Sequence, residues 1–385
     1  MGNFCRRLFN AHTAPVWICL LFTAILLLLP TGFEDKEVFK ESDIRPARVI
    51  STDESTLIDT GLIRSGEQIC QIEILSGKFK GRQTDGKNIL IGSLEQDKLF
   101  SAGDTALVRI NYTDDRILNV SMIDHYRIPW ELIMAGLFVV LLVGFAGWTG
   151  LRAVLSFIVT VLCIWKVLVP LYLKGWDPIF AGLVIAVLLT VIIIALVYGF
   201  DRRCAAAVSG SVLGLLITCL LGIFFTSAFK IHGAVMSYSE SLLYAGYQDL
   251  NLTRIFMASI FIGASGAVMD LSVDITSAVY ELVQKRPDLT RWEAAKSGMN
   301  VGRAAMGTMT TTLLLAYSGG YIALLMVFMA QGTPISNIFN YKYVAAELIH
   351  TLIGSFGLVT VAPFTALCAG FLLPSVKNIS EKNKK

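Results

Sequence analysis

Charged residues are scarce in this chain. Only 16% of its 385 residues are Asp, Glu, Lys or Arg, whereas 55% are hydrophobic, a balance that soluble globular domains seldom reach. The net charge is only +3, and the basic residues stand at the ends of apolar runs instead of clustering, so a nucleic-acid partner has no support. The sequence therefore predicts an integral membrane protein, whose first partner is the lipid bilayer.

Several chemical signatures are also missing. The seven cysteines include no CxxC pair, and six of them lie in or beside apolar segments, so we expect neither a disulfide framework nor a zinc site: Cys5, Cys19, Cys70, Cys163, Cys204, Cys219 and Cys368. No run of the GxxxxGK[ST] type is present, which argues against ATP use by this chain. We expect no metal and no cofactor.

Long apolar runs predict about eight membrane-spanning helices. The first run, residues 14–30, has no small-x-small cleavage pattern after it, which favours an uncleaved signal anchor over a signal peptide. Seven further spans are expected at about residues 130–147, 151–173, 178–199, 204–228, 254–281, 301–330 and 344–373.

A polar segment separates the first two spans. It contains five short runs of alternating apolar and polar residues between glycine-containing turns: ARVIST, EQICQIEIL, GRQTDGKNILI, TALVRINY and RILNVSMI. Such runs are typical of a small all-β barrel of the OB or SH3-like kind, and the pattern does not choose between them. The expected organisation is a cytoplasmic amino terminus with the first span in residues 1–31, an extracytoplasmic all-β domain in 32–128 and a seven-helix membrane domain in 129–385.

The basic residues in short loops favour both termini in the cytoplasm. Lys and Arg are retained on the cytoplasmic side of membrane proteins. With the amino terminus inside, the inner segments hold thirteen basic residues: Arg6, Arg7, Arg152, Arg202, Arg203, Lys285, Arg286, Arg291, Lys296, Lys377, Lys382, Lys384 and Lys385. The outer short loops hold only Lys174, Lys230, Arg254 and Lys342.

The span expected at residues 254–281 carries three carboxylates. At 100° per residue, Asp270, Asp274 and Glu281 fall on one narrow stripe of the helix. Gly263, Gly266 and Ser277 lie on the same stripe. A charge at membrane depth costs roughly 2.5 to 3.5 kcal/mol, so we expect this stripe to face protein or a hydrated cavity and not lipid.

The next span carries a second polar stripe, formed by Asn300, Arg303, Gly307, Thr311 and Ser318. A hairpin through residues 284–296 would bring Arg303 near Glu281 or Asp274. A structural ion pair is the simpler interpretation of that approach. However, one arginine cannot neutralise all three acids, and an unpaired acid binds a cation or a proton. This excess favours a proton or cation pathway, with Arg303 and Glu281 as an inner gate or charge clamp.

The last span places Glu347, His350, Thr351 and Gly354 on one face. A histidine beside a glutamate is suited to relaying protons. It is equally consistent with a histidine that only packs between helices. Both interpretations stay open at this point.

These segments contain two linked motifs, GAxGAxMD at residues 263–270 and GMNxGRxxMGTMxxTL at residues 298–313. With them, the chain closely resembles the YibE/F family of bacterial multi-pass membrane proteins over roughly its whole length. The motif positions are Gly263, Gly266, Asp270, Gly298, Asn300, Gly302, Arg303, Gly307 and Thr308, and Thr311 stands where the family often has Asn. We expect Gly263, Gly266, Gly298, Gly302 and Gly307 to mediate helix packing. The resemblance implies a protein of the bacterial plasma membrane whose expected activity is transport.

Three functions remain in competition. The favoured one is a proton- or cation-coupled transporter or exporter of an unknown small solute or ion, which is not an enzyme; a homo-oligomer is compatible with it. The second is a membrane scaffold or sensor whose β domain binds an envelope partner. The third is a rhomboid-like intramembrane serine protease with Ser265 and His350 as catalytic residues, an assignment that leaves the acid stripe unexplained.

Overall fold

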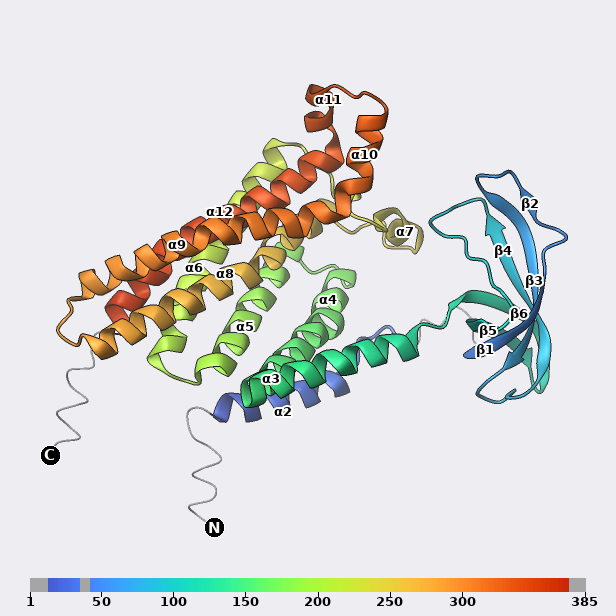
Figure 1. Ribbon diagram of the computed structural model, residues 1–385, viewed down its shortest axis with the longest axis horizontal. Coiled ribbons are helices and arrows are strands. Elements are labelled where there is room, and N and C mark those ends of the chain that lie inside the picture. The colour runs from blue at the N-terminus through green and yellow to red at the C-terminus, as the bar shows by residue number, and fades with distance from the viewer. Residues whose placement is uncertain (1–12, 35–41, 374–385) are drawn as a thin grey trace, which may run out of the picture. The chain divides into compact units, whose positions relative to one another are not determined.

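The computed structural model describes residues 13–34 and 42–373 and divides the chain into two compact units (Figure 1). One unit comprises residues 1–33 and 146–385, and the other comprises residues 34–145. Several residues used above to predict orientation or cysteine chemistry lie outside the described ranges: Cys5, Arg6, Arg7, Lys377, Lys382, Lys384 and Lys385.

The smaller unit contains a closed β barrel. Its strands are β1 (Ser42–Asp53), β2 (Ile58–Asp59), β3 (Arg64–Ile74), β4 (Gln83–Ile91), β5 (Thr105–Thr113) and β6 (Arg116–His125). The order β1-β5-β6-β4-β3 closes through a β1–β3 pairing, and β4 and β6 pair in parallel at Lys87 and Ser121. This connectivity is that of the OB-fold and not of an SH3-like barrel. The five predicted strand runs form the barrel, and the two-residue β2 was not predicted.

Alternation along the strands builds the barrel core. Ile72 and Ile74 of β3 and Val108 and Ile110 of β5 are fully buried, while the residues between them face outward. Such a period of two leaves every second side chain for the solvent face. The core is therefore formed by one face of each strand, as the sequence pattern predicts.

A buried amide pair ties the β4–β5 connection to the barrel. The side chain of Gln68 donates to the carbonyl of Phe100 (2.9 Å) and accepts from the backbone N–H of Phe100 (3.1 Å). The Asn88 amide donates to Gln68 Oε1 (3.0 Å) and to the carbonyl of Lys98 (2.6 Å). Because buried polar groups are costly when unpaired, these bonds fix the connection in one position.

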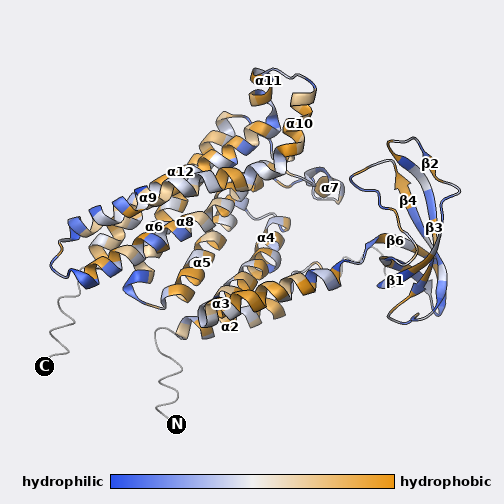
Figure 2. Cartoon of the chain, viewed as in Figure 1, coloured by the Kyte–Doolittle hydropathy of each residue, from blue (hydrophilic) through white to orange (hydrophobic). Residues whose placement is uncertain are grey.

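The larger unit is helical. The helices are α2 (Ala14–Leu28), α3 (Ile128–Cys163), η1 (Ile164–Leu168), α4 (Val169–Leu173), α5 (Pro178–Tyr198), α6 (Arg202–Ala228), η2 (Gly233–Val235), α7 (Ser239–Tyr244), α8 (Leu252–Lys285), α9 (Arg291–Ser318), η3 (Gly319–Tyr321), α10 (Ile322–Ala330), α11 (Ile335–Asn340) and α12 (Lys342–Leu372); the first part of α3 belongs to the smaller unit. Figure 2 shows hydrophobic residues over most of α5 and α10, whereas hydrophilic residues gather where α8 joins α9.

Six described helical segments are long and apolar enough to cross a membrane: Ile128–Leu173, Pro178–Tyr198, Arg202–Ala228, Leu252–Lys285, Arg291–Ala330 and Lys342–Leu372. The expected number of eight is not confirmed. Two of the expected spans, 130–147 and 151–173, fall within the single segment Ile128–Leu173, which is interrupted at Gly147 (φ 54°, ψ −125°). The first expected span appears as α2, an apolar helix of 15 residues.

Helix α12 lies at the centre of the helical unit and packs against α6, α8 and α9. Small residues allow these close approaches. A Cβ placed at Gly214 of α6 would meet the Val361 side chain at 2.7 Å, and one placed at Gly370 of α12 would meet Ala295 Cβ at 2.6 Å. These distances are shorter than real Cβ contacts, so glycine is required where the backbones come this close.

Candidate functional site

The acid stripe lies on α8. Asp270 is near the middle of this helix, about 27 Å along the axis from Leu252 and about 22 Å from Lys285. Leu271 and Ile275 point into the helical core and are fully buried, whereas Asp270, Asp274 and Glu281 lie on the exposed face. Helical periodicity thus places the three acids on one side of α8, and the other described residues leave them exposed.

Asp270 and Asp274 have no ion pair and no hydrogen bond to any residue that the structure describes. Glu281 pairs with Lys285, one turn away on the same helix, at 3.3 Å. Asp270 and Asp274 are separated by one helical turn, so their carboxylates could share a cation or a proton. Among residues 13–34 and 42–373, no third acid, histidine or cysteine joins them to form a metal-binding group.

The expected ion pair between Arg303 and Glu281 or Asp274 is not formed. Helix α9 turns Gly302 toward α8, where a Cβ would meet Ile275 Cδ1 at 3.0 Å. Arg303 follows Gly302 by one residue, which is 100° around the helix, and it lies on the exposed face of α9. The hairpin between the two helices is present, but the glycine contacts set a rotation of α9 that keeps Arg303 away from the acids.

Helix α9 has a polar surface of its own. Asn300 and Arg303 line a surface hollow of about 250 Å³ together with Trp292, Lys296 and Met299. Farther along the helix, Gly307, Thr308 and Thr311 are also exposed. The arginine in this hollow forms no ion pair within the described part of the chain, so the first half of α9 presents an unpaired cation.

A cluster that sequence reasoning missed lies beside the acid stripe. The Tyr198 hydroxyl forms hydrogen bonds with Ser277 Oγ (2.7 Å) and with the carbonyl of Val273 (2.6 Å). The Arg203 guanidinium stacks on the rings of Tyr280 (4.5 Å) and Tyr198 (5.1 Å). The position of Ser277 on the acid stripe was the one sign of this cluster in the sequence. Its partner Tyr198 lies on α5, so the sequence of α8 alone could not identify it.

A second polar group lies between the first parts of α8 and α12. His350 Nε2 is 3.3 Å from Ser259 Oγ, and its ring packs against Phe256 (5.0 Å) and Tyr317 (5.7 Å). One carboxylate oxygen of Glu347 is buried without a hydrogen-bond partner in the described part of the chain. Glu347 and His350 share a face of α12, as expected, but no hydrogen bond joins them.

The predicted protease pair is not assembled. Ser265 Oγ donates to the carbonyl of Ile262 at 2.7 Å, a bond within its own helix. His350 instead meets Ser259, six residues earlier on α8. The point along α8 at which α12 crosses it determines which serine contacts His350. The sequence of a single helix does not encode that crossing point.

The motif glycines have different surroundings. A Cβ at Gly298 would meet Val279 Cγ2 at 2.7 Å, and one at Gly302 would meet Ala362 Cβ at 2.9 Å. One at Gly263 would meet the Tyr317 hydroxyl at 2.7 Å. A Cβ at Gly266 or Gly307 would have no neighbour within 4 Å in the described part of the chain, so these two glycines make no helix contact there. Gly266 and Gly307 lie on exposed parts of the polar stripes of α8 and α9.

Long apolar helices, with carboxylates at the middle of one of them, are the features of a multi-pass helical membrane protein. The chain belongs to the YibE/F-like protein family, which it matches over residues 134–375. The match contains both motifs but begins inside α3, so it is narrower than the expected resemblance and does not include α2 or the β domain. No curated protein and no solved structure matches the chain.

Proposed function

We propose that the protein is an ion-coupled transporter of a small solute or ion, in which Asp270 and Asp274 take up the coupling proton or cation. One observation carries the proposal: two carboxylates lie one turn apart near the middle of a long apolar helix, without an ion pair or hydrogen bond to the residues that the structure describes. Charge at this depth is unfavourable, and two like charges repel each other. A bound proton or cation would remove both penalties.

The surrounding polar residues would line the route. Asn300 and Arg303 are placed at its inner end together with Glu281, where they set the local charge. Glu347 and His350 are placed in its outer half, where His350 and Ser259 provide exchangeable protons. In this proposal the protein lies in the plasma membrane with both termini in the cytoplasm and the β domain outside, where that domain is free to bind an envelope partner.

A second copy of the chain would complete the site. The exposed faces of α8 and α9 carry opposite charges, Asp270 and Asp274 on one and Arg303 on the other. Neither face is compatible with lipid, because charged side chains at depth are directed to protein or water. We therefore place these faces at an interface within a homo-oligomer, around a hydrated path.

Cation addition to energised everted membrane vesicles tests this function without knowledge of the substrate. Vesicles with wild-type protein should show cation-dependent recovery of a quenched ΔpH dye, scanned over monovalent and divalent cations. Asp270→Asn and Asp274→Asn should abolish the response. Asp288→Asn, which removes a carboxylate from the exposed α8–α9 connection, is the matched control and should behave as wild type.

Carbodiimide labelling provides an independent readout of the protonated acid. The reagent should modify Asp270 or Asp274 more strongly as the pH falls, and added coupling cation should protect them. A wild-type protein without flux for any cation and without labelling of either residue would refute the proposal. Unchanged flux in Asp270→Asn would remove this residue from the mechanism.

A further inference from the structure

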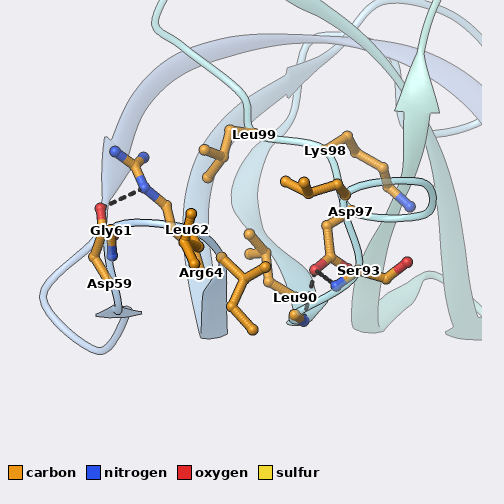
Figure 3. A pocket seen from close by; sticks show the side chains of 12 residues that line it. Asp59, Gly61, Leu62, Arg64, Leu90, Ser93, Asp97, Lys98 and Leu99 are labelled. Atoms are coloured by element: carbon orange, nitrogen blue, oxygen red, sulfur yellow. Dashed lines mark hydrogen bonds and ion pairs between the residues drawn. The ribbon is translucent and has the colours of Figure 1, made fainter. Parts of the chain in front are cut away.

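One end of the β barrel carries apolar side chains on protruding turns. The turn between β2 and β3 and the segment that follows β4 enclose a hollow of about 280 Å³ (Figure 3). Leu62 and Leu94 are 85% and 84% exposed at these turns, and Ile58 and Ile91 are each 65% exposed beside them. Four large apolar side chains so close together form a patch that a soluble surface seldom leaves uncovered.

Hydrogen bonds to two aspartates hold these turns in shape. Asp59 accepts from the backbone N–H of Gly61 (2.7 Å) and from Arg64 Nε (2.8 Å). Asp97 accepts from the backbone N–H groups of Ile91, Gly92 and Ser93 at 2.7 to 3.0 Å. The backbone donors lower the pKa of both carboxyls, which therefore stay charged and bonded at neutral pH. The leucines are thus presented outward by formed turns.

The same end of the barrel leads directly into an apolar helix. Strands β4 and β6 run in parallel, so the end of β4 at Ile91 and the end of β6 at His125 lie at one end of the barrel. Only Tyr126 and Arg127 separate β6 from α3, which begins at Ile128. Two residues span at most about 7 Å, so this end lies close to the start of α3, which opens a segment apolar enough to enter a membrane.

Among the described residues, the opposite end has no such apolar turns. Its connections are the β3–β4 turn and the β5–β6 turn, which expose Lys78, Lys80, Asp114 and Asp115. Lys78 pairs with Asp115 at 2.8 Å across these two turns. Both ends of the barrel carry charged residues, and they differ in that exposed leucines tip the turns only at the end that joins α3.

We infer that the leucine-tipped end of the barrel docks on the outer surface of the bilayer, with Leu62 and Leu94 inserted at the level of the headgroups. Arg64 and Lys98 flank the hollow between the two turns and can reach lipid phosphates while their stems lie along the apolar patch. This docking would hold the barrel against the membrane and open the hollow toward the lipid. It does not depend on the proposed transport activity.

Site-specific fluorescence in nanodiscs tests the docking on the full chain. An environment-sensitive fluorophore is attached to Leu62→Cys, Leu94→Cys and, as the matched control, Leu118→Cys. Leu118 is also exposed (62%) and apolar, but it follows the charged β5–β6 turn at the other end. The unsubstituted chain, whose described cysteines are buried or half-buried, gives the labelling background.

Docking predicts severalfold stronger quenching by spin-labelled lipid at positions 62 and 94 than at 118, and the reverse order with aqueous iodide. Equal iodide quenching at all three positions would show that the turns lie in water and would overturn the inference. Protection of positions 62 and 94 from both quenchers would also overturn it, because a protein partner would then cover the patch. Unchanged melting temperatures show that each labelled variant is folded.

Discussion

Cys70 shows how the environment of one residue controls its chemistry. The side chain is fully buried in the barrel core beside Ile72 and Val108. Burial, assisted by the negative charge of Glu54, raises the pKa of the Cys70 thiol to about 11. The thiolate is the reactive form of cysteine, so this thiol is unreactive at neutral pH although no disulfide protects it.

The raised pKa of Cys70 predicts a loss of barrel stability at alkaline pH. The unfolded thiol ionises near its ordinary pKa of about 9 and the folded thiol near 11, so the stabilising contribution is complete below pH 9 and lost between about pH 9 and 11. We expect a decrease of about 1 to 3 kcal/mol from this group. Denaturation of wild type and Cys70→Ala across this pH range measures it. Equal pH slopes in the two proteins would contradict the assignment.

At the scale of helices, the glycines of α9 determine which side chains face α8. Gly298 and Gly302 lie one turn apart on the contact side, against Val279 and Ile275. Gly307 lies on the exposed side and has no neighbour within 4 Å of a Cβ. The same residue type therefore has two roles on one helix, close packing at the first two positions and an open surface at the third.

Substitution of these glycines should separate the two roles. Gly298→Leu forces a side chain into the contact with Val279 and should destabilise the helical unit by about 1 to 3 kcal/mol. A side chain at Gly307→Leu meets no described residue of its own chain, so it should leave the melting temperature unchanged in a detergent that keeps the protein monomeric. A loss of stability in Gly307→Leu as large as that in Gly298→Leu would show that the exposed face of α9 packs against another part of the same chain.

The comparison of α8 with α9 shows how far the sequence could predict the structure. Periodicity along one helix placed the three acids of α8 on one face, and alternation predicted the five barrel strands. The rotation of α9 about its own axis depends on contacts at Gly302 that involve α8 and α12, so the direction of Arg303 could not be predicted. Likewise, the point at which α12 crosses α8 makes Ser259, and not Ser265, the partner of His350.

At the scale of the whole molecule, the helical unit leaves one segment largely uncovered. In Arg291–Ala330, only 11% of an apolar stretch of 18 residues is buried. The corresponding share in Leu252–Lys285 is 56%. Lipid can cover the apolar side chains of this segment, but it is a poor environment for Arg303 and Asn300. Lipid is also a poor environment for Asp270 on α8. The proposed second copy of the chain would provide a polar surface for all three residues.

A second copy of the chain predicts site-specific cross-links in native membranes. Thr311→Cys lies on the same exposed polar stripe of α9 as Arg303, about two turns farther along the helix, and should form oxidised dimers. Val184→Cys, also exposed (48%) but on the apolar surface of α5, is the control and should not. Because two apolar faces associate weakly in lipid whereas unpaired charges at depth favour pairing, the difference between the two positions reports charge-driven assembly. If neither variant cross-links and the protein has the mass of a single chain in nanodiscs, then no second copy covers the acid stripe, and water within one chain must solvate Asp270 and Asp274.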